Sequence, residues 1–233
     1  MIGDAAAQYT LDALETLIDV NGKRDSRHSF AHLQLARPED IQRIGDLGMS
    51  VHTSPYWMNM DDYFWKLNLP YLGRERAFNQ QYPFNSLFEA GANVTIASDF
   101  WVTEPNCLFA IYCGMTRHIP KAVFDDSYGA DSPYRWLSDP DAKIEDGDVG
   151  VLPPHEERVS LENMIVASTL NGAYANFLDE NIGSIEVGKL ADLVILEQNL
   201  FEVEIEEIPK TRIVMTFFEG QQVYSADEQR KLS

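Results

Sequence analysis

The residue of this chain best placed to do chemistry is Asp99, an acid that closely follows the apolar, β-branched segment 94–97. Such a segment, preceded by the turn-prone residues 90–93, predicts a buried strand. In a parallel α/β sheet or barrel the carboxyl ends of the strands form the floor of the active site, so this acid is a candidate base or metal ligand. An equally simple interpretation is that Asp99 caps whatever follows the strand, and spacing does not decide between the two.

His32 is the second candidate, and it stands out among five histidines because it lies in a predicted strand, residues 30–34, ahead of the Asp99 strand. An imidazole and a carboxylate can jointly bind zinc or a similar divalent ion. Two ligands are too few for a catalytic zinc, which usually takes three from the protein, and no compact metal motif is present. His52, on the following strand, could contribute, or strand alternation could turn it into the sheet wall.

Composition restricts the class of protein and the partners. The 233 residues are 45% apolar and 11% aromatic, as in folded globular proteins, and the formal charge is -19. This charge disfavours nucleic acid and anionic membrane surfaces as partners. The two cysteines require no oxidising compartment, and no apolar run reaches the roughly 18 residues that span a bilayer. We expect a cytoplasmic protein.

The elements that position Asp99 follow the order strand, helix, strand, helix, strand. This order and spacing are typical of parallel βα units and predict an α/β fold. Asp4 is expected to cap the first helix, and Asn21-Gly22 to end it. The predicted elements are a helix over 4–21, a strand over 30–34, a helix over 38–48, a strand over 49–53, a short helix over 85–89 and the strand over 94–97.

The second half of the chain has a different pattern of predicted elements. A helix is expected over 105–117, and the irregular stretch 125–158 fits either a substrate loop or flexible decoration. Ser160 is a strong N-cap for a helix to about 170, which a second helical piece extends to 178. Short strands then follow at 184–187, 193–196, 213–218 and 222–224, and they predict antiparallel sheet.

Several segments have a pattern that is specific to one protein family. They include Ile2-Gly3-Asp4 before a helix, Arg27-His28 to His32-Leu33-Gln34, Ala97-Ser98-Asp99, and above all the tail Gly183-Ser184-Ile185-Glu186-Val187-Gly188-Lys189-Leu190-Ala191-Asp192-Leu193-Val194. Together they cover essentially the whole chain. The chain resembles the amidohydrolase superfamily, in particular the branch of N-substituted formamide deformylases.

This resemblance implies a fold, a metal and a reaction. The fold would be part of a TIM-like (β/α) barrel, about strands five/six to eight, over residues 1–181, with 182–233 contributing strands to a composite β-sandwich. His32 and Asp99 would bind a divalent metal, zinc or else iron or manganese. Asp99 would also act catalytically, in the hydrolysis of a non-peptide carbon–nitrogen bond of a small amide or cyclic amide. His52, Trp57 and Arg117 would contact the substrate.

The departures from the family pattern matter as much. The family carries a His-x-His pair on its first strand and a His just before Ile-Gly-Asp, whereas this sequence has Met1 at about the latter position. Ala31 replaces a common Glu, and Trp57 stands where a His contact or ligand is expected. The chain therefore resembles the carboxyl-terminal half of a longer hydrolase, and such a chain can also lack the metal.

Three hypotheses follow. The first is a hydrolase that is competent only with a complementary N-terminal half. The second is a non-catalytic binding or regulatory module that keeps the scaffold, which the Trp57 and Ala31 departures favour. The third is a homo-oligomer that buries the open edges of a half-barrel.

Overall fold

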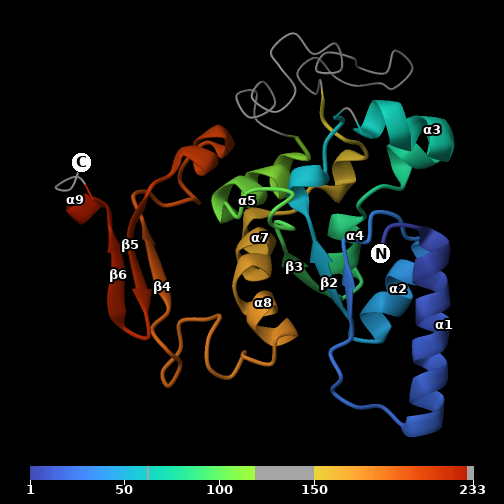
Figure 1. Ribbon diagram of the computed structural model, residues 1–233, viewed down its shortest axis with the longest axis horizontal. Coiled ribbons are helices and arrows are strands. Elements are labelled where there is room, and N and C mark those ends of the chain that lie inside the picture. The colour runs from blue at the N-terminus through green and yellow to red at the C-terminus, as the bar shows by residue number, and fades with distance from the viewer. Residues whose placement is uncertain (62, 119–149, 230–233) are drawn as a thin grey trace.

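The fold combines helices with two separate three-stranded sheets (Figure 1). The computed structural model describes residues 1–61, 63–118 and 150–229. One sheet is parallel, as the βα pattern predicts, and has the spatial order β1-β2-β3. The other is antiparallel with the order β4-β5-β6. The strands are β1 (Ser29–Ala31), β2 (Ser50–Thr53), β3 (Asn93–Ile96), β4 (Leu193–Leu196), β5 (Ile213–Phe218) and β6 (Gln221–Ser225).

Three helices connect and flank the parallel strands. α2 (Pro38–Asp46) crosses from β1 to β2, and α4 (Phe84–Glu89) leads into β3, while α1 (Asp4–Asn21) packs on α2. α2 begins with a proline, whose fixed φ suits the first helical position. The helix-covered face of the sheet is apolar: Phe30, Val51 and Val94 are 2%, 0% and 0% exposed.

The other face of the parallel sheet is polar. Ser50 pairs in register with Asn93, and His52 with Thr95, so the four side chains point to the same side. The Asn93 side-chain amide donates to the Ser50 hydroxyl at 2.8 Å, and His52 Nδ1 lies 2.7 Å from Thr95 Oγ1. The sheet therefore separates an apolar, helix-packed side from a hydrogen-bonded polar side.

The long connection expected after β2 is largely helical. It contains the turns η1 (Pro55–Trp57) and η2 (Phe64–Asn68), then α3 (Leu69–Asn79). The Phe64 ring is 1% exposed and meets the Phe78 ring edge-on at 5.0 Å between centroids. Aromatic burial thus orders a segment whose helical periodicity is too weak to be recognised from the sequence.

A second helical layer covers β3. Asn106 caps α5 (Cys107–Thr116) by accepting from the Phe109 amide at 3.2 Å. Ser160 caps α7 as predicted, accepting from the Asn163 amide at 3.3 Å. The remaining elements are η4 (His155–Glu157), α7 (Leu161–Ser168), α8 (Leu170–Ala175), η5 (Ile205–Lys210) and α9 (Ala226–Gln229).

Some local predictions are wrong or untested. Gly3, not Asp4, caps α1, because Asp4 is already the first helical residue. Residues 184–187 form no strand: positive φ angles at Gly183 and Gly188 and a bond from the Lys189 amide to the Glu186 carbonyl make a turn there. Most of the predicted irregular stretch 125–158 lies outside the described residues. Within the described part, no helix is long and apolar enough to cross a membrane.

Candidate active site

His32 and Asp99 lie where the chain leaves the carboxyl ends of β1 and β3. The two strands flank β2, and the His32 amide donates to the His52 carbonyl at 2.8 Å, so His32 continues the sheet register by one residue. Both residues turn the chain with positive φ, 71° at His32 and 55° at Asp99. Burial lowers the pKa of the His32 imidazole, and the Asp99 carboxylate opposes this shift without reversing it. The fold therefore brings the two candidates into one neighbourhood.

The surroundings of His32 favour the neutral imidazole. Burial lowers the pKa of His32, the Met1 amino group lowers it further, and together they outweigh the effect of Asp99. Trp57 stacks on the ring, with 4.8 Å between centroids and 23° between planes. Ser54 Oγ lies 3.5 Å from His32 Nδ1. A neutral imidazole is the form that binds a metal ion.

His52 lies on the polar face of the sheet rather than in the helix-packed wall. Its Nδ1 pairs with Thr95 Oγ1, and burial lowers the pKa of His52. Because Thr53 Oγ1 donates to the Thr95 carbonyl at 2.9 Å, the two strands are also tied together beside the imidazole. The β2 strand thus carries a second positioned imidazole, at the residue whose backbone carbonyl accepts from the His32 amide.

Arg117, which was also expected to contact the substrate, is buried in the protein interior. Its side chain is 0% exposed, and the guanidinium donates at 2.8 Å to each of three carbonyls, those of Leu152, Tyr82 and Gln81. Burial lowers the pKa of Arg117 to about 10. A guanidinium enclosed by backbone offers no donor to a small molecule, so the substrate contact expected for Arg117 finds no support in the structure, and its contacts are those of a structural residue.

The described residues contain no group of three or more His, Cys, Asp or Glu side chains that could hold a metal ion. His32 and Asp99 are chemically suitable ligands, but a catalytic zinc usually takes three from the protein. The described part of the chain therefore supplies an incomplete ligand set.

The loop after β3 carries residues that the sequence reasoning missed. Phe100 and Trp101 directly follow Asp99, and their rings stack with 4.3 Å between centroids. They are 55% and 88% exposed. The signal was present in the sequence as an aromatic pair next to the strand-end acid.

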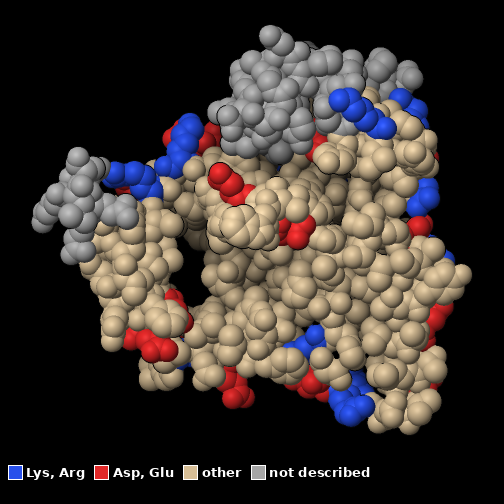
Figure 2. Space-filling model, in the orientation of Figure 1, with Lys and Arg blue, Asp and Glu red and all other residues tan. Residues whose placement is uncertain are grey.

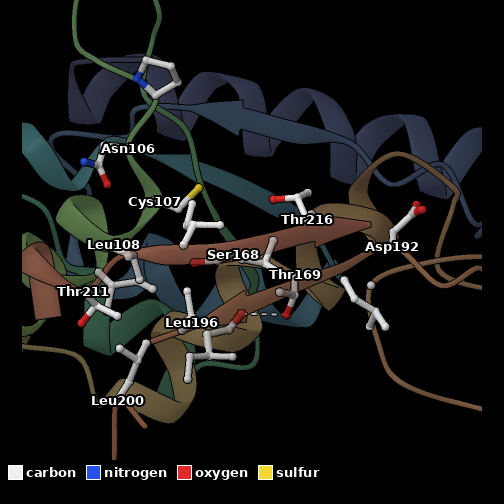
Figure 3. Close-up of a pocket in the computed structure, with 18 of the residues that line it drawn as sticks. Asn106, Cys107, Leu108, Ser168, Thr169, Asp192, Leu196, Leu200, Thr211 and Thr216 are labelled. Carbon is white, nitrogen blue, oxygen red and sulfur yellow. Dashed lines mark hydrogen bonds between the residues drawn. The ribbon is translucent and has the colours of Figure 1, made fainter. Parts of the chain in front are cut away.

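A large cavity lies apart from the candidate metal ligands His32 and Asp99. It measures about 1850 Å³ and separates the C-terminal sheet from α5, α7 and α8, where the molecular surface is visibly hollowed (Figure 2). Leu108, Leu196 and Leu200 line it together with a few polar groups such as Thr169 (Figure 3). The lining includes Phe100 but neither candidate metal ligand, so the cavity is not the candidate active site.

Comparison with known proteins identifies the class of protein. The fold aligns with an uncharacterized metal-dependent hydrolase from Pyrococcus horikoshii at a TM-score of 0.61 and 16% identity, over 88% of this chain and 34% of that one. Residues 1–224 match the amidohydrolase family, and the chain belongs to that family. The resemblance drawn from the tail and from the Ala97-Ser98-Asp99 segment is confirmed.

Two relatives are similar in sequence to nearly the whole of this chain. The chain is 30% identical over 224 residues to Protein LONG AFTER FAR-RED 3 of Arabidopsis thaliana, which covers 96% of this chain and 33% of that protein. It is 23% identical over 223 residues to the N-substituted formamide deformylase of Arthrobacter pascens, over 94% of this chain and 34% of that enzyme. The chain thus spans about a third of the length of both relatives.

Proposed function

We propose that this chain forms the carboxyl-terminal part of a metal-dependent hydrolase that cleaves a non-peptide carbon–nitrogen bond in a small amide or cyclic amide. The observation that carries the proposal is that His32 and Asp99 follow the carboxyl ends of two parallel strands, β1 and β3, which flank β2 in one sheet. Family membership supports hydrolysis of carbon–nitrogen bonds in general.

The proposed architecture is a sector of a (β/α) barrel over 1–181, about strands five/six to eight, with 182–233 adding strands to a composite β-sandwich. The positions of His32 and Asp99 after the carboxyl ends of β1 and β3 support this, because catalytic residues of such barrels come from the ends of several strands. No residue of β4 or β5 is buried, which supports a second sheet layer outside this chain.

The roles of the residues follow from their chemistry. When bound, a zinc ion, or iron or manganese in its place, would lower the pKa of a water molecule and polarise the substrate carbonyl. His32 and Asp99 would be two of its protein ligands, and the remaining ones would come from outside the described residues. The Asp99 carboxylate would accept a proton from the attacking water and pass it to the leaving nitrogen. His52 and Trp57 would border the substrate.

The complementary part is proposed to be an N-terminal half or a second copy of the chain. Either would supply strands beside the parallel sheet and the missing metal ligands. The relatives, about three times as long as the matched region, support a longer complementary polypeptide rather than a second copy.

The test is metal content and hydrolysis in the same preparation. Zinc per chain and cleavage of a panel of N-substituted formamides and cyclic amides are measured with the chain alone and with the N-terminal two thirds of a full-length relative. We expect metal and turnover only in the mixture, with both lost in His32→Ala and Asp99→Asn. His28→Ala, an exposed histidine just before β1, is the matched control. Turnover that survives both site substitutions would refute the proposal.

A non-catalytic module is the second candidate. It is favoured by the Trp57 ring, which covers one face of His32, and by the incomplete ligand set of the described residues. A well-folded mixture with neither metal nor turnover would support this candidate.

A further inference from the structure

The chain turns at His32 and Leu33 through a backbone conformation that is uncommon for such residues. Both have a positive φ, 71° at His32 and 46° at Leu33, although neither is a glycine. A Cβ atom disfavours this left-handed region, so two consecutive residues keep it only where surrounding contacts hold the chain. The direction in which the His32 imidazole leaves the backbone therefore depends on the contacts that hold this turn.

The turn is held from two sides. On the sheet side, the His32 amide donates to the His52 carbonyl at 2.8 Å. On the other side, Gln34 Nε2 donates to Gln81 Oε1 at 2.6 Å, and the Gln34 carbonyl accepts from the Tyr82 amide at 2.7 Å. The Gln34 and Gln81 side chains belong to residues that are only 8% and 1% exposed. Their hydrogen bond is thus shielded from water, where such a bond is strongest.

The Gln81 side chain is itself fixed in orientation. Its Nε2 donates to the Ala77 carbonyl of α3 at 2.8 Å, and its Oε1 accepts a second hydrogen bond from Asn68 Nδ2 at 3.0 Å. Because a carbonyl can only accept, the Ala77 bond turns the amide so that its oxygen faces Gln34. The Gln81 backbone carbonyl also accepts from the Arg117 guanidinium at 2.8 Å. Gln81 therefore presents one acceptor to Gln34 in a defined place.

We propose that Gln81 is a positioning residue for His32. It acts through Gln34, two residues beyond the imidazole, and holds the turn so that the ring keeps its place against Trp57 beside the strand ends. The inference rests on the proposed function only for the use of the imidazole as a metal ligand. The position of the ring can be measured in the full chain without metal or substrate.

The experiment observes the His32 ring directly. The Trp57 indole stacks on it at 4.8 Å between centroids, so its ring current shifts the His32 ring-proton resonances upfield. Proton–carbon NMR at about pH 8, where an imidazole of ordinary pKa is neutral, records this shift free of protonation changes. His32→Ala assigns the resonances, and Trp57→Leu defines complete loss of the shift. We expect Gln81→Met, which removes the three side-chain hydrogen bonds but keeps the length, to lose most of it.

Three further variants separate positioning from general destabilisation. Gln34→Met removes the same hydrogen bond from its other end and should lose the shift as well, which also provides the test if Gln81→Met does not fold. Gln81→Glu keeps an oxygen that can accept from Gln34 and should retain most of the shift. Asn68→Ala is the matched control, because it removes the other donor to the same Gln81 oxygen without touching Gln34. It should leave the shift unchanged.

Two results would overturn the inference. One is an unchanged His32 shift in folded Gln81→Met or Gln34→Met, with the fold checked by circular dichroism. The other is an equal loss of the shift in Asn68→Ala, which would show that any weakening of this region displaces the ring.

The failure of this inference is distinguishable from that of the proposed function. A wild-type mixture with the N-terminal two thirds of a relative that gains neither metal nor turnover would refute the hydrolase and leave the NMR result standing. A His32 shift retained in Gln81→Met and Gln34→Met would overturn the positioning role alone, whatever the mixture hydrolyses.

Discussion

The parallel-sheet part and the C-terminal sheet contain similar apolar residues but bury them very differently. In the former, Ile44, Val51 and Phe84 are all 0% exposed. In the latter, Val194 is 55% and Phe218 57% exposed, and no residue of β4 or β5 is buried. Figure 1 shows the same contrast: helices cover the parallel sheet, whereas the antiparallel sheet stands apart from the remaining elements.

This contrast indicates which part is stable by itself. Buried apolar surface contributes about 25 cal/mol per Å², and a three-stranded sheet needs a packed apolar face for independent stability. The parallel-sheet part meets this requirement within the chain. The C-terminal sheet, facing a cavity of about 1850 Å³, meets it only with a covering layer.

The largest difference between the two parts is expected in the free energy of unfolding that is lost when one phenylalanine in each is replaced by alanine. Phe84→Ala leaves a cavity in a fully buried site and should lower the free energy of unfolding by about 3–5 kcal/mol. Phe218→Ala, at 57% exposure, should cost less than about 1 kcal/mol. Urea unfolding measures both. If a complementary polypeptide covers the C-terminal sheet, the second cost should rise in its presence, and equal costs in the isolated chain would contradict the comparison.

Two arginines extend the comparison to polar contacts. Arg117→Met leaves three buried carbonyls without their donor and should cost about 3 kcal/mol. Arg212→Met removes an ion pair with Glu197 at 2.6 Å in which both side chains are about half exposed, and should cost under about 1 kcal/mol. Thermal unfolding of both variants checks the order. A larger loss in Arg212→Met would show that the C-terminal sheet is better packed than its exposure indicates.

Two glycines probe backbone packing. A Cβ on Gly45 would overlap the Ala90 carbonyl oxygen where α2 meets α4, so Gly45→Ala should cost about 1–3 kcal/mol. Gly172, on the α8 side that faces the cavity, has nothing within 4 Å of such a Cβ. Gly172→Ala should therefore stabilise α8 by about 0.5–1 kcal/mol. Calorimetry gives both signs, and destabilisation by Gly172→Ala would mean that this face is already filled.

The smallest difference between the two parts is expected in how their stability changes at acidic pH. Burial alone would raise the pKa of Asp40, but hydrogen bonds from Arg37 and Arg43 at 2.6 and 2.8 Å outweigh it and hold the pKa below its ordinary value. The unfolded chain then takes up the proton first, so the stabilising effect is present above about pH 4 and is lost as the pH falls through the folded pKa.

Asp40→Asn should therefore flatten the decline in stability between about pH 5 and pH 3. Glu186→Gln is the matched control in the C-terminal part, because hydrogen bonds from Ser184 and Lys189 also lower the pKa of Glu186, but at an exposed site. Its pH profile should stay close to that of the wild type. Urea titrations at several pH values compare the three proteins, and parallel profiles would contradict the role given to Asp40.

The sequence alone determined those features that depend on local pattern. Apolar strands separated by amphipathic helices predicted that β1, β2 and β3 are parallel, and the Ser160 cap predicted the start of α7. The position of Asp99 after a strand follows from the same pattern. The pattern placed His32 within a strand over 30–34, whereas β1 ends at Ala31 and His32 follows it. The tail motif over residues 183–194 indicated the protein family.

The tertiary structure decided everything that depends on contacts between distant residues. Arg117 looked like a substrate contact until its carbonyl partners, 35 or more residues away along the chain, enclosed it. Residues 184–187 have the composition of a strand, but two glycines with positive φ turn them. A local sequence pattern could not predict that Trp57 stacks on His32 or that the C-terminal sheet is uncovered. Burial depends on which surfaces the whole chain brings together.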